Sequence, residues 1–395
     1  MSIIFGYLEF TTTSTPTSSP GRIVFIDVLR AYAILMMLQG HFVDTLLDVA
    51  YRDTSSVIYN TWLFMRGMTA PVFFTVTGLV FVYLLLRDGR PFQENKRVKK
   101  GIRRGFFLLG VGYLLKINFP ALLVFQIYPW FWAVDVLHII GLSLIALIVL
   151  AGIIARVGGP LPLWMLLAGI LTFFADPFFT ENTFAYLPRF LANYITMDYG
   201  SNFVIVPWVG FTFFGGALGA LLSKRPQLAQ GHLLPIALLA LGFALHFETA
   251  FMLESLYAAT QFDFLTVLIH NNYLFWRLGH VFIVMSLFIW VVPRIGKIPA
   301  LITRIGSETL TVYGAHYVVL YGTWLGVGLS QIIGYRSLSP IPCAIGALLF
   351  VLSGVLFIAY IDPIRDRWEN VKSVVRKYFK QLYGQLVVAS KKSQL

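Results

Sequence analysis

Apolar residues follow one another along most of this chain in continuous runs of roughly 20 residues, the length that crosses a bilayer as an α-helix. Continuous runs exclude a membrane β-barrel, whose strands alternate apolar and polar positions. The pattern predicts an all-α, polytopic membrane protein with about ten transmembrane helices. The runs cover about residues 23–47, 67–86, 104–123, 134–155, 161–177, 203–223, 233–254, 273–292, 308–332 and 341–361.

Basic residues are unevenly distributed between the predicted loops. Cytoplasmic loops of membrane proteins are rich in Lys and Arg, so the two most basic segments, about residues 87–104 and 365–392, are expected in the cytoplasm. Alternation of the spans then places both termini in the cytoplasm. Only Arg52, Arg189 and Arg336 remain in the outer loops. We expect an integral multi-pass protein of a bacterial inner membrane.

The composition agrees with an integral membrane protein, and the distribution of basic residues accounts for the net charge. The chain is 58% hydrophobic and only 12% charged, far from the usual soluble composition. Its net charge of +12 is explained by the cytoplasmic basic segments. No nucleic-acid partner is expected, whereas membrane lipids are. A second copy of the chain or a partner in a membrane complex is compatible with the sequence.

The chain contains no linker long enough to separate soluble domains. Residues 1–21 are rich in Ser, Thr and Pro, lack the pattern of a signal peptide and predict a disordered polar tail. Residues 22–361 form one membrane domain. Residues 362–395 combine Lys and Arg with apolar residues at helical spacing, which predicts a basic amphipathic helix on the cytoplasmic side of the membrane.

The first span carries two ionisable side chains, Arg30 and His41. Such groups are costly in a membrane and mark functional sites. Eleven positions apart, they differ by only about 20° around a helix and lie about 16 Å apart along it. Both therefore point from one helix face into one cavity, at two depths. Asp27 precedes Arg30 by three positions, close enough to orient its guanidinium, although such a pair also suits a simple helix anchor.

Further ionisable side chains occur within or at the ends of other spans. Some must pair with one another, because an unpaired charge in hydrocarbon is expensive. The histidines are scattered over several helices without ligand spacing, so we predict no metal site. The candidates for lining a substrate site, besides Asp27, are Arg66, Asp135, His138, Arg277, His280 and His316.

Several short motifs resemble those of multipass membrane acyltransferases. FIDVLR at residues 25–30, followed by His41, is similar to the opening signature of the acyltransferase-3 family, and more similar to the heparan-alpha-glucosaminide N-acetyltransferase group. This chain has Ala31 where the family usually has glycine. The resemblance extends over about residues 22–361. It continues with RGMTAPVFFTVTG at 66–78, the basic segment 97–104, DVLHIIG at 135–141, PWVGFTFFGG at 207–216 and IGSETLTVYGAH at 305–316.

The resemblance implies transfer of an acyl group, usually acetyl, from cytoplasmic acyl-coenzyme A to a glycan or lipid-linked acceptor. It implies that His41 is the catalytic histidine and that Arg30 holds the phosphate or pantetheine part of the donor. The basic cluster with Arg97, Lys100 and Arg104 would help to bind donor phosphates, although such a cluster is also a common signal of membrane orientation.

The chemistry of His41 suits this reaction without reference to the family. Acyl transfer from a thioester needs a base whose pKa is near neutral, and an imidazole supplies one. We expect His41 to take a proton from the acceptor while Asp44 orients the imidazole ring. A covalent acetyl-histidine intermediate is the other route.

Two other functions fit the same residues. Buried charges also serve transporters and flippases, which would show an inverted repeat and broken helices at matching positions. A non-catalytic subunit of a larger membrane complex would keep the fold as a scaffold. A cavity around His41 that accepts coenzyme A would favour the enzyme.

Overall fold

The computed structural model describes residues 23–270 and 272–373, and regular secondary structure in these ranges is helical. The predicted tail at 1–21 lies outside them. The predicted C-terminal helix is described only to residue 373, and residues 361–373 are helical. The helices are α2 (Val24–Leu46), α3 (Val57–Arg66), α4 (Thr69–Arg87), α5 (Lys96–Leu114), α6 (Phe119–Leu123), α7 (Val136–Val157), α8 (Leu161–Glu181), α9 (Arg189–Ala192), α10 (Ile205–Lys224), α11 (Leu233–Phe247), α12 (Thr249–Thr260), α13 (Phe264–His270), α14 (Tyr273–Val291), α15 (Ala300–Ser307), α16 (Thr309–Tyr321), α17 (Leu329–Ile333) and α18 (Pro340–Ala359).

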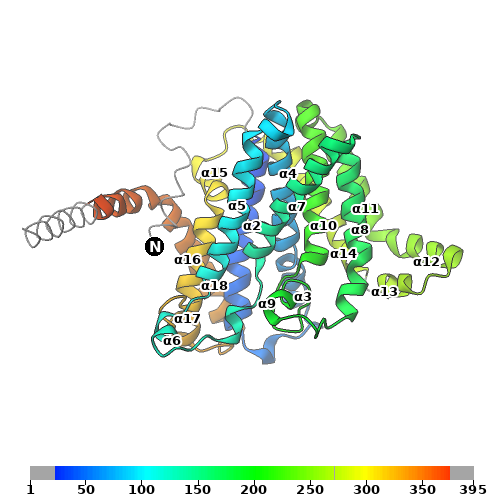
Figure 1. Ribbon diagram of the computed structural model, residues 1–395. Coiled ribbons are helices and arrows are strands. Elements are labelled where there is room, and N and C mark those ends of the chain that lie inside the picture. Colours follow the sequence, from blue (N-terminus) through cyan, green and yellow to red (C-terminus); the bar gives the residue numbers. More distant parts are fainter. Residues whose placement is uncertain (1–22, 271, 374–395) are drawn as a thin grey trace, which may run out of the picture.

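The long helices run roughly parallel to one axis (Figure 1). We call the end of the bundle where α2 begins the α15 end, and the opposite end, with α3, α6, α9 and α17, the α3 end. Helices α12 and α13 project sideways. Seven helical segments in the described ranges are long and apolar enough to cross a bilayer, or eight if the pair α11 and α12, bent by 58°, is one span. The chain is therefore an integral multi-pass membrane protein.

The predicted count of about ten spans is not confirmed. The runs at 104–123 and 308–332 correspond to α5 and α16, and neither helix meets the criterion of length and apolarity. Helix α5 begins among lysines and arginines, and α16 has only 13 residues before it ends at Gly322. The run at 233–254 is divided between the two bent helices α11 and α12.

Close approach of two helix backbones fixes the centre of the bundle. Helix α10 packs against α4 and α8. A side chain at Gly78 of α4 would clash with the Thr212 carbonyl of α10, and one at Gly215 of α10 would clash with the Thr75 carbonyl of α4. Small residues let membrane helices approach in this way, where burial of apolar surface provides little driving force. The α4–α10 contact thus provides a rigid support for the neighbouring helices.

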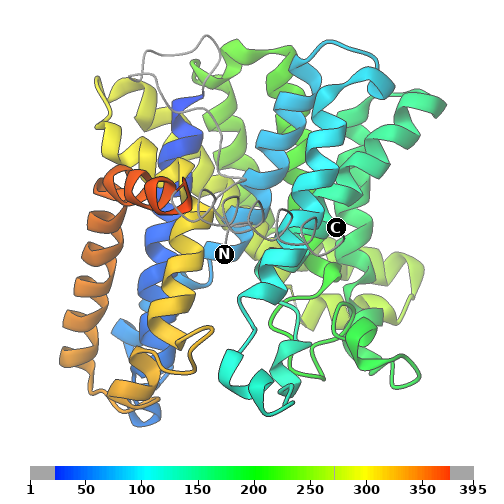
Figure 2. The same ribbon diagram turned by 60° about the vertical axis from the view of Figure 1, so that its left-hand side comes forward.

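Helices α2, α15, α16 and α18 lie on one side of the molecule, and α5 and α7 lie across from them (Figure 2). On the first side, α2 packs against both α15 and α18. On the second side, α5 packs against α7, where Gly105 and Gly141 meet backbone to backbone. The functional cavity lies between these two sides.

Candidate functional site

A cavity of about 1240 Å³ lies between α2 and α16 on one side and α4, α5 and α7 on the other. Ligand pockets usually measure about 300–1,000 Å³, so this one has room for more than one small substrate. Its lining extends from Arg30, Arg104 and Thr309 to residues near the ends of α2 and α16 at the α3 end of the bundle. The cavity therefore follows α2 over most of its length.

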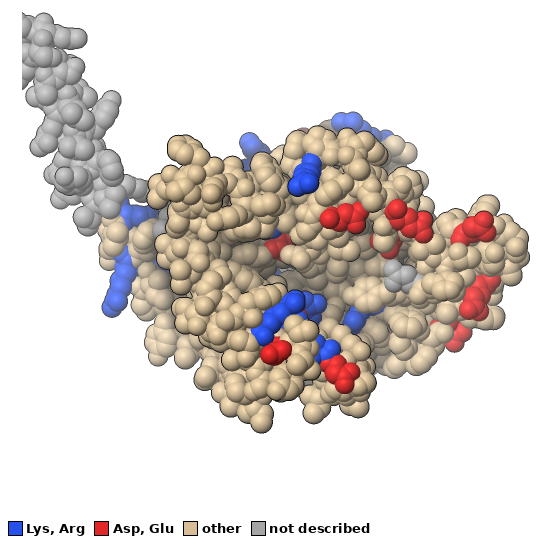
Figure 3. Space-filling view, turned by 90° about the horizontal axis from the view of Figure 1, so that it is seen from below, with Lys and Arg blue, Asp and Glu red and all other residues tan. Residues whose placement is uncertain are grey.

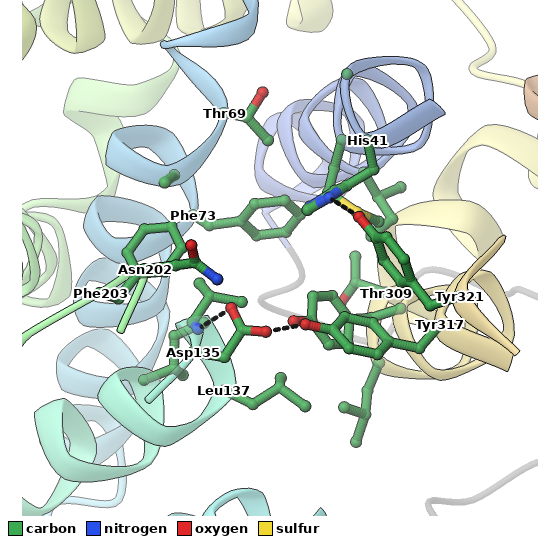
Figure 4. Close-up of a pocket in the computed structure, with 18 of the residues that line it drawn as sticks. His41, Thr69, Phe73, Asp135, Leu137, Asn202, Phe203, Thr309, Tyr317 and Tyr321 are labelled. Atoms are coloured by element: carbon green, nitrogen blue, oxygen red, sulfur yellow. Dashed lines mark hydrogen bonds between the residues drawn. The ribbon is translucent and has the colours of Figure 1, made fainter. Parts of the chain in front are cut away.

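Arg30 and His41, the two unusual residues of α2, both line this cavity. The Arg30 Nη2 donates a hydrogen bond of 2.9 Å to Thr309 Oγ1, at the start of α16. His41 Nδ1 lies 2.9 Å from the Tyr321 hydroxyl, at the end of α16 (Figure 4). Helices α2 and α16 therefore run in the same direction and are joined by hydrogen bonds at both ends of the cavity.

Helix α16 presents a polar stripe to the cavity. Thr309, Tyr313, Tyr317 and Tyr321 all line it. They follow one another at intervals of four residues, which places them on one face of the helix. This stripe was not predicted from the sequence as part of the site. Its four-residue spacing within an apolar run would have indicated a polar helix face.

Asp135 faces His41 across the cavity. The Tyr317 hydroxyl donates a hydrogen bond to Asp135 Oδ2, and the backbone N–H of Val136 donates one of 2.7 Å to Oδ1 (Figure 4). The Tyr317 bond connects α16 to the start of α7. Lys116, which also lines the cavity, donates to the carbonyl of Ala133 two residues before the aspartate. Asp135, which the sequence predicted to contact substrate, thus lies in the cavity wall.

His138 and His316 do not line the cavity but pack behind its walls. His138 Nδ1 accepts a hydrogen bond of 3.1 Å from the backbone N–H of Asp135, which closes a capping box at the start of α7. The His316 ring lies 5.0 Å from the His41 ring and is buried. Both histidines support cavity residues in this structure, whereas the sequence predicted direct contact with substrate.

Asp44, predicted to orient His41, is bound by Arg66. The Arg66 Nε donates to Asp44 Oδ2 at 2.6 Å, and Nη2 contacts the same oxygen. The hydrogen-bond partner of the His41 ring is Tyr321. Asp44 and Arg66 both line the cavity as an ion pair one turn beyond His41.

Arg277 and His280 of α14 lie outside the cavity lining. The Arg277 Nη1 donates to the Phe64 carbonyl at 3.0 Å, and its guanidinium stacks on the Phe64 and Tyr273 rings. His280 Nε2 lies 3.2 Å from His246 Nδ1. These contacts join α14 to α3 and α11, so this part of the predicted substrate site is not assembled here.

The remaining candidates belong to the α15 end. Asp27 lies where α15 packs most closely on α2, with Gly306 against its backbone carbonyl. Arg97 and Lys100 are in the first turns of α5 and do not line the cavity, whereas Arg104 does. Partial burial and the neighbouring Arg97 lower the pKa of Lys100. The segment thus concentrates positive charge beside the cavity.

Comparison with known families matches residues 22–247 to the catalytic domain of heparan-alpha-glucosaminide N-acetyltransferase. This match covers more than half of the chain, from the start of α2 to the end of α11, and is shorter than the expected 22–361. Helix α16 therefore lies outside it. No curated protein and no solved structure matches the chain. The chain belongs to the family of heparan-alpha-glucosaminide N-acetyltransferase catalytic domains, and it is a membrane acyltransferase by that membership.

Proposed function

We propose that this protein transfers an acetyl group from cytoplasmic acetyl-coenzyme A to a sugar or lipid-linked acceptor at the outer side of the membrane. The observation that carries the proposal is the single cavity, which has arginines at the α15 end and His41 near the α3 end. Positive charge in the segment 87–104 favours a cytoplasmic α15 end. Donor and acceptor then approach His41 from opposite sides.

Arg30 and Arg104 are the residues of this chain that suit the donor. Both line the cavity at the α15 end, and guanidinium groups bind phosphate through paired hydrogen bonds. Arg30 is positioned by its bond to Thr309, and the Arg104 guanidinium lies over the Phe107 ring at 5.3 Å. A pantetheine arm extended along α2 from this position brings its thioester toward His41.

His41 acts as the general base in this proposal. When Nδ1–H donates to the Tyr321 oxygen, Nε2 keeps the lone pair that takes a proton. The acceptor oxygen or nitrogen gives its proton to Nε2 and forms a bond to the acetyl carbon. The carbon–sulfur bond then breaks, and the leaving thiolate takes the proton from the imidazolium. A neutral imidazole is restored at the end of the cycle.

Tyr321 has a second role in the same step. Its oxygen can accept from His41 Nδ1 and from Thr45 Oγ1, which lies 3.4 Å away. Its own O–H is then directed to the cavity and can stabilise the negative charge that develops on the acetyl oxygen. Donors that are already in place for a developing oxyanion often make the largest contribution to catalysis.

The test is sided transfer in vesicles. Purified protein is reconstituted, labelled acetyl-coenzyme A is supplied on one side and glucosamine on the other, and acetylated sugar is measured. We expect transfer when the donor faces the α15 end, and its loss in His41→Ala, with His232→Ala as a matched control because His232 does not line the cavity. Passage of intact coenzyme A without acetylation would instead support a transporter.

A further inference from the structure

Two arginines from separate outer loops converge on the mouth of the cavity at the α3 end. Arg52 follows α2, Arg336 follows α17, and both line the cavity. Outer loops are normally poor in basic residues, and the sequence has only three arginines in the predicted ones. Two of these three are at the cavity mouth.

Both loops are fixed against the last turn of α2. The Arg52 Nη2 donates to the carbonyls of Asp44 and Leu47 at 2.7 and 2.8 Å. The backbone N–H of Arg336 donates to the Thr45 carbonyl at 3.0 Å. Carbonyls of the same helical turn thus hold Arg52 by its side chain and Arg336 by its backbone.

Arg336 adopts a backbone conformation that is unusual for its residue type. Its φ is 55°, in the left-handed region, which non-glycine residues adopt mainly where the surrounding structure holds them. Its guanidinium lies 4.8 Å from the centre of the Tyr335 ring, and both side chains line the cavity. The loop therefore places this charge at the solvent-exposed mouth of the cavity.

The arginines at this mouth differ in their pairing with carboxylates. Arg66 is paired with Asp44, but within the described ranges no carboxylate forms a salt bridge with Arg52 or Arg336. The bonds from Arg52 to the backbone use Nε and Nη2, so Nη1 is available to a ligand. Viewed from the α3 end, basic side chains, with acidic ones beside them, border a hollow in the surface (Figure 3).

We propose that this pair of arginines, together with the cavity mouth, binds a phosphate group on the acceptor sugar. Two guanidinium groups match a phosphate monoester, whose charge is about −2 near pH 7, better than a carboxylate with a single charge. Arg and phosphate also form paired, charge-assisted hydrogen bonds. The inference rests on the proposed acetyl transfer, because it concerns the acceptor of that reaction.

The position of the subsite suits the reaction. Thr45, whose carbonyl holds Arg336, is one helical turn, about 6 Å, beyond His41, and its hydroxyl contacts the same Tyr321 that binds the His41 ring. A phosphate held here leaves the rest of the sugar between Arg336 and the imidazole. The phosphate can belong to a soluble sugar phosphate, which is a monoester, or to a sugar linked through phosphate to a lipid, a diester whose single charge is a weaker match to two guanidinium groups.

The kinetic test compares glucosamine, glucosamine 6-phosphate, glucosamine linked through phosphate to a lipid, and glucuronic acid as acceptors. We expect kcat/KM for at least one phosphorylated acceptor to exceed that for glucosamine by about tenfold or more. Arg336→Gln, which keeps the backbone bond to Thr45, should remove this preference by lowering kcat/KM for the phosphorylated acceptor far more than for glucosamine. Arg189→Gln, an exposed outer arginine away from the cavity, is the matched control.

The results distinguish a soluble sugar phosphate from a lipid-linked one, and they can also contradict the proposal. Preference for the soluble or for the lipid-linked phosphate identifies the source. Equal kcat/KM for glucosamine and both phosphorylated acceptors, a stronger preference for glucuronic acid, or an equal loss for all acceptors in Arg336→Gln overturns the proposal.

A binding measurement makes the subsite testable without catalysis. Labelled glucosamine 6-phosphate is titrated into purified His41→Ala protein and into the same protein with Arg336→Gln added. Tighter binding of the phosphorylated sugar than of glucosamine, lost with Arg336→Gln, supports the subsite even if acetyl transfer is never observed. Equal binding of both sugars to both proteins overturns it.

Discussion

Helices α2 and α14 share the same kinds of ionisable residue but differ in their environments. Each is an apolar span with an arginine and a histidine, Arg30 and His41 in α2 and Arg277 and His280 in α14. The first pair lines the large cavity, and its partners are polar side chains of α16. The second pair contacts a backbone carbonyl, aromatic rings and another histidine, and the cavity lining does not include it.

The comparison shows that the free-energy cost of placing an ionisable residue in a membrane span can be offset in two ways. It can be directed into a polar cavity, where a substrate can reach it, or it can be satisfied by neighbouring helices and hold them together. The sequence alone does not distinguish an ionisable residue that faces a cavity from one that joins helices. Only their surroundings distinguish a reactive histidine from a packing one.

The largest expected effect is the difference in kcat between substitutions of His41 and of His280. We expect His41→Ala to lower kcat for acetyl transfer by about 10²–10⁴-fold, the usual contribution of a general base, and His280→Ala to change it less than about twofold. Initial rates with labelled acetyl-coenzyme A and glucosamine measure both. Equal losses in the two variants would contradict the distinction between α2 and α14.

A smaller effect is expected at Tyr321, which acts partly through His41. Tyr321→Phe removes one hydrogen bond to the imidazole, so kcat should fall about tenfold, with little change in KM for acetyl-coenzyme A. The double variant with His41→Ala should be slower than His41→Ala alone by less than the effect of Tyr321→Phe in the original protein, because part of that effect passes through His41. Tyr360→Phe, at the exposed end of α18, serves as the control, and additive losses would refute the coupling.

The α15 end of the cavity should affect donor binding rather than the chemical step. Arg104→Gln removes one charged donor to the phosphates, which is worth about 1.5–3 kcal/mol, and should raise KM for acetyl-coenzyme A about tenfold or more while kcat stays nearly constant. Arg156→Gln, exposed at the end of α7, is the matched control. A fall in kcat with unchanged KM would place the donor elsewhere.

We expect the smallest effect on activity at α14, where His280→Ala should instead lower the thermal stability of the protein. His280→Ala leaves His246 Nδ1 without its hydrogen-bond partner, which costs about 1–3 kcal/mol when the group is buried and less here, because His280 is half-buried. Thermal unfolding in detergent should shift down by a few degrees. An unchanged melting temperature would show that this histidine pair does not stabilise the bundle.

Several features of the fold follow from local sequence. Runs of apolar residues predicted most of the membrane helices, because bilayer thickness imposes a length on each of them. The prediction was least accurate for α5 and α16, which both line the cavity. Helix α5 begins with basic residues, and α16 ends at Gly322 after 13 residues, so neither has the apolar length of a span. Apolar length therefore predicts α2 as a span but not α5 and α16, which form other parts of the cavity wall.

The sequence by itself determined the membrane class, and the spacing that puts Arg30 and His41 on one face of α2. Both properties depend on residues within one helix, where the 3.6-residue period is fixed by the backbone. The tertiary structure decided that Tyr321, 280 positions away, binds His41 while Arg66 takes Asp44. It also decided that His138 and His316 lie behind the cavity walls. Such partners depend on how helices pack in three dimensions, and neither hydrophobic length nor helical period specifies which helix faces which.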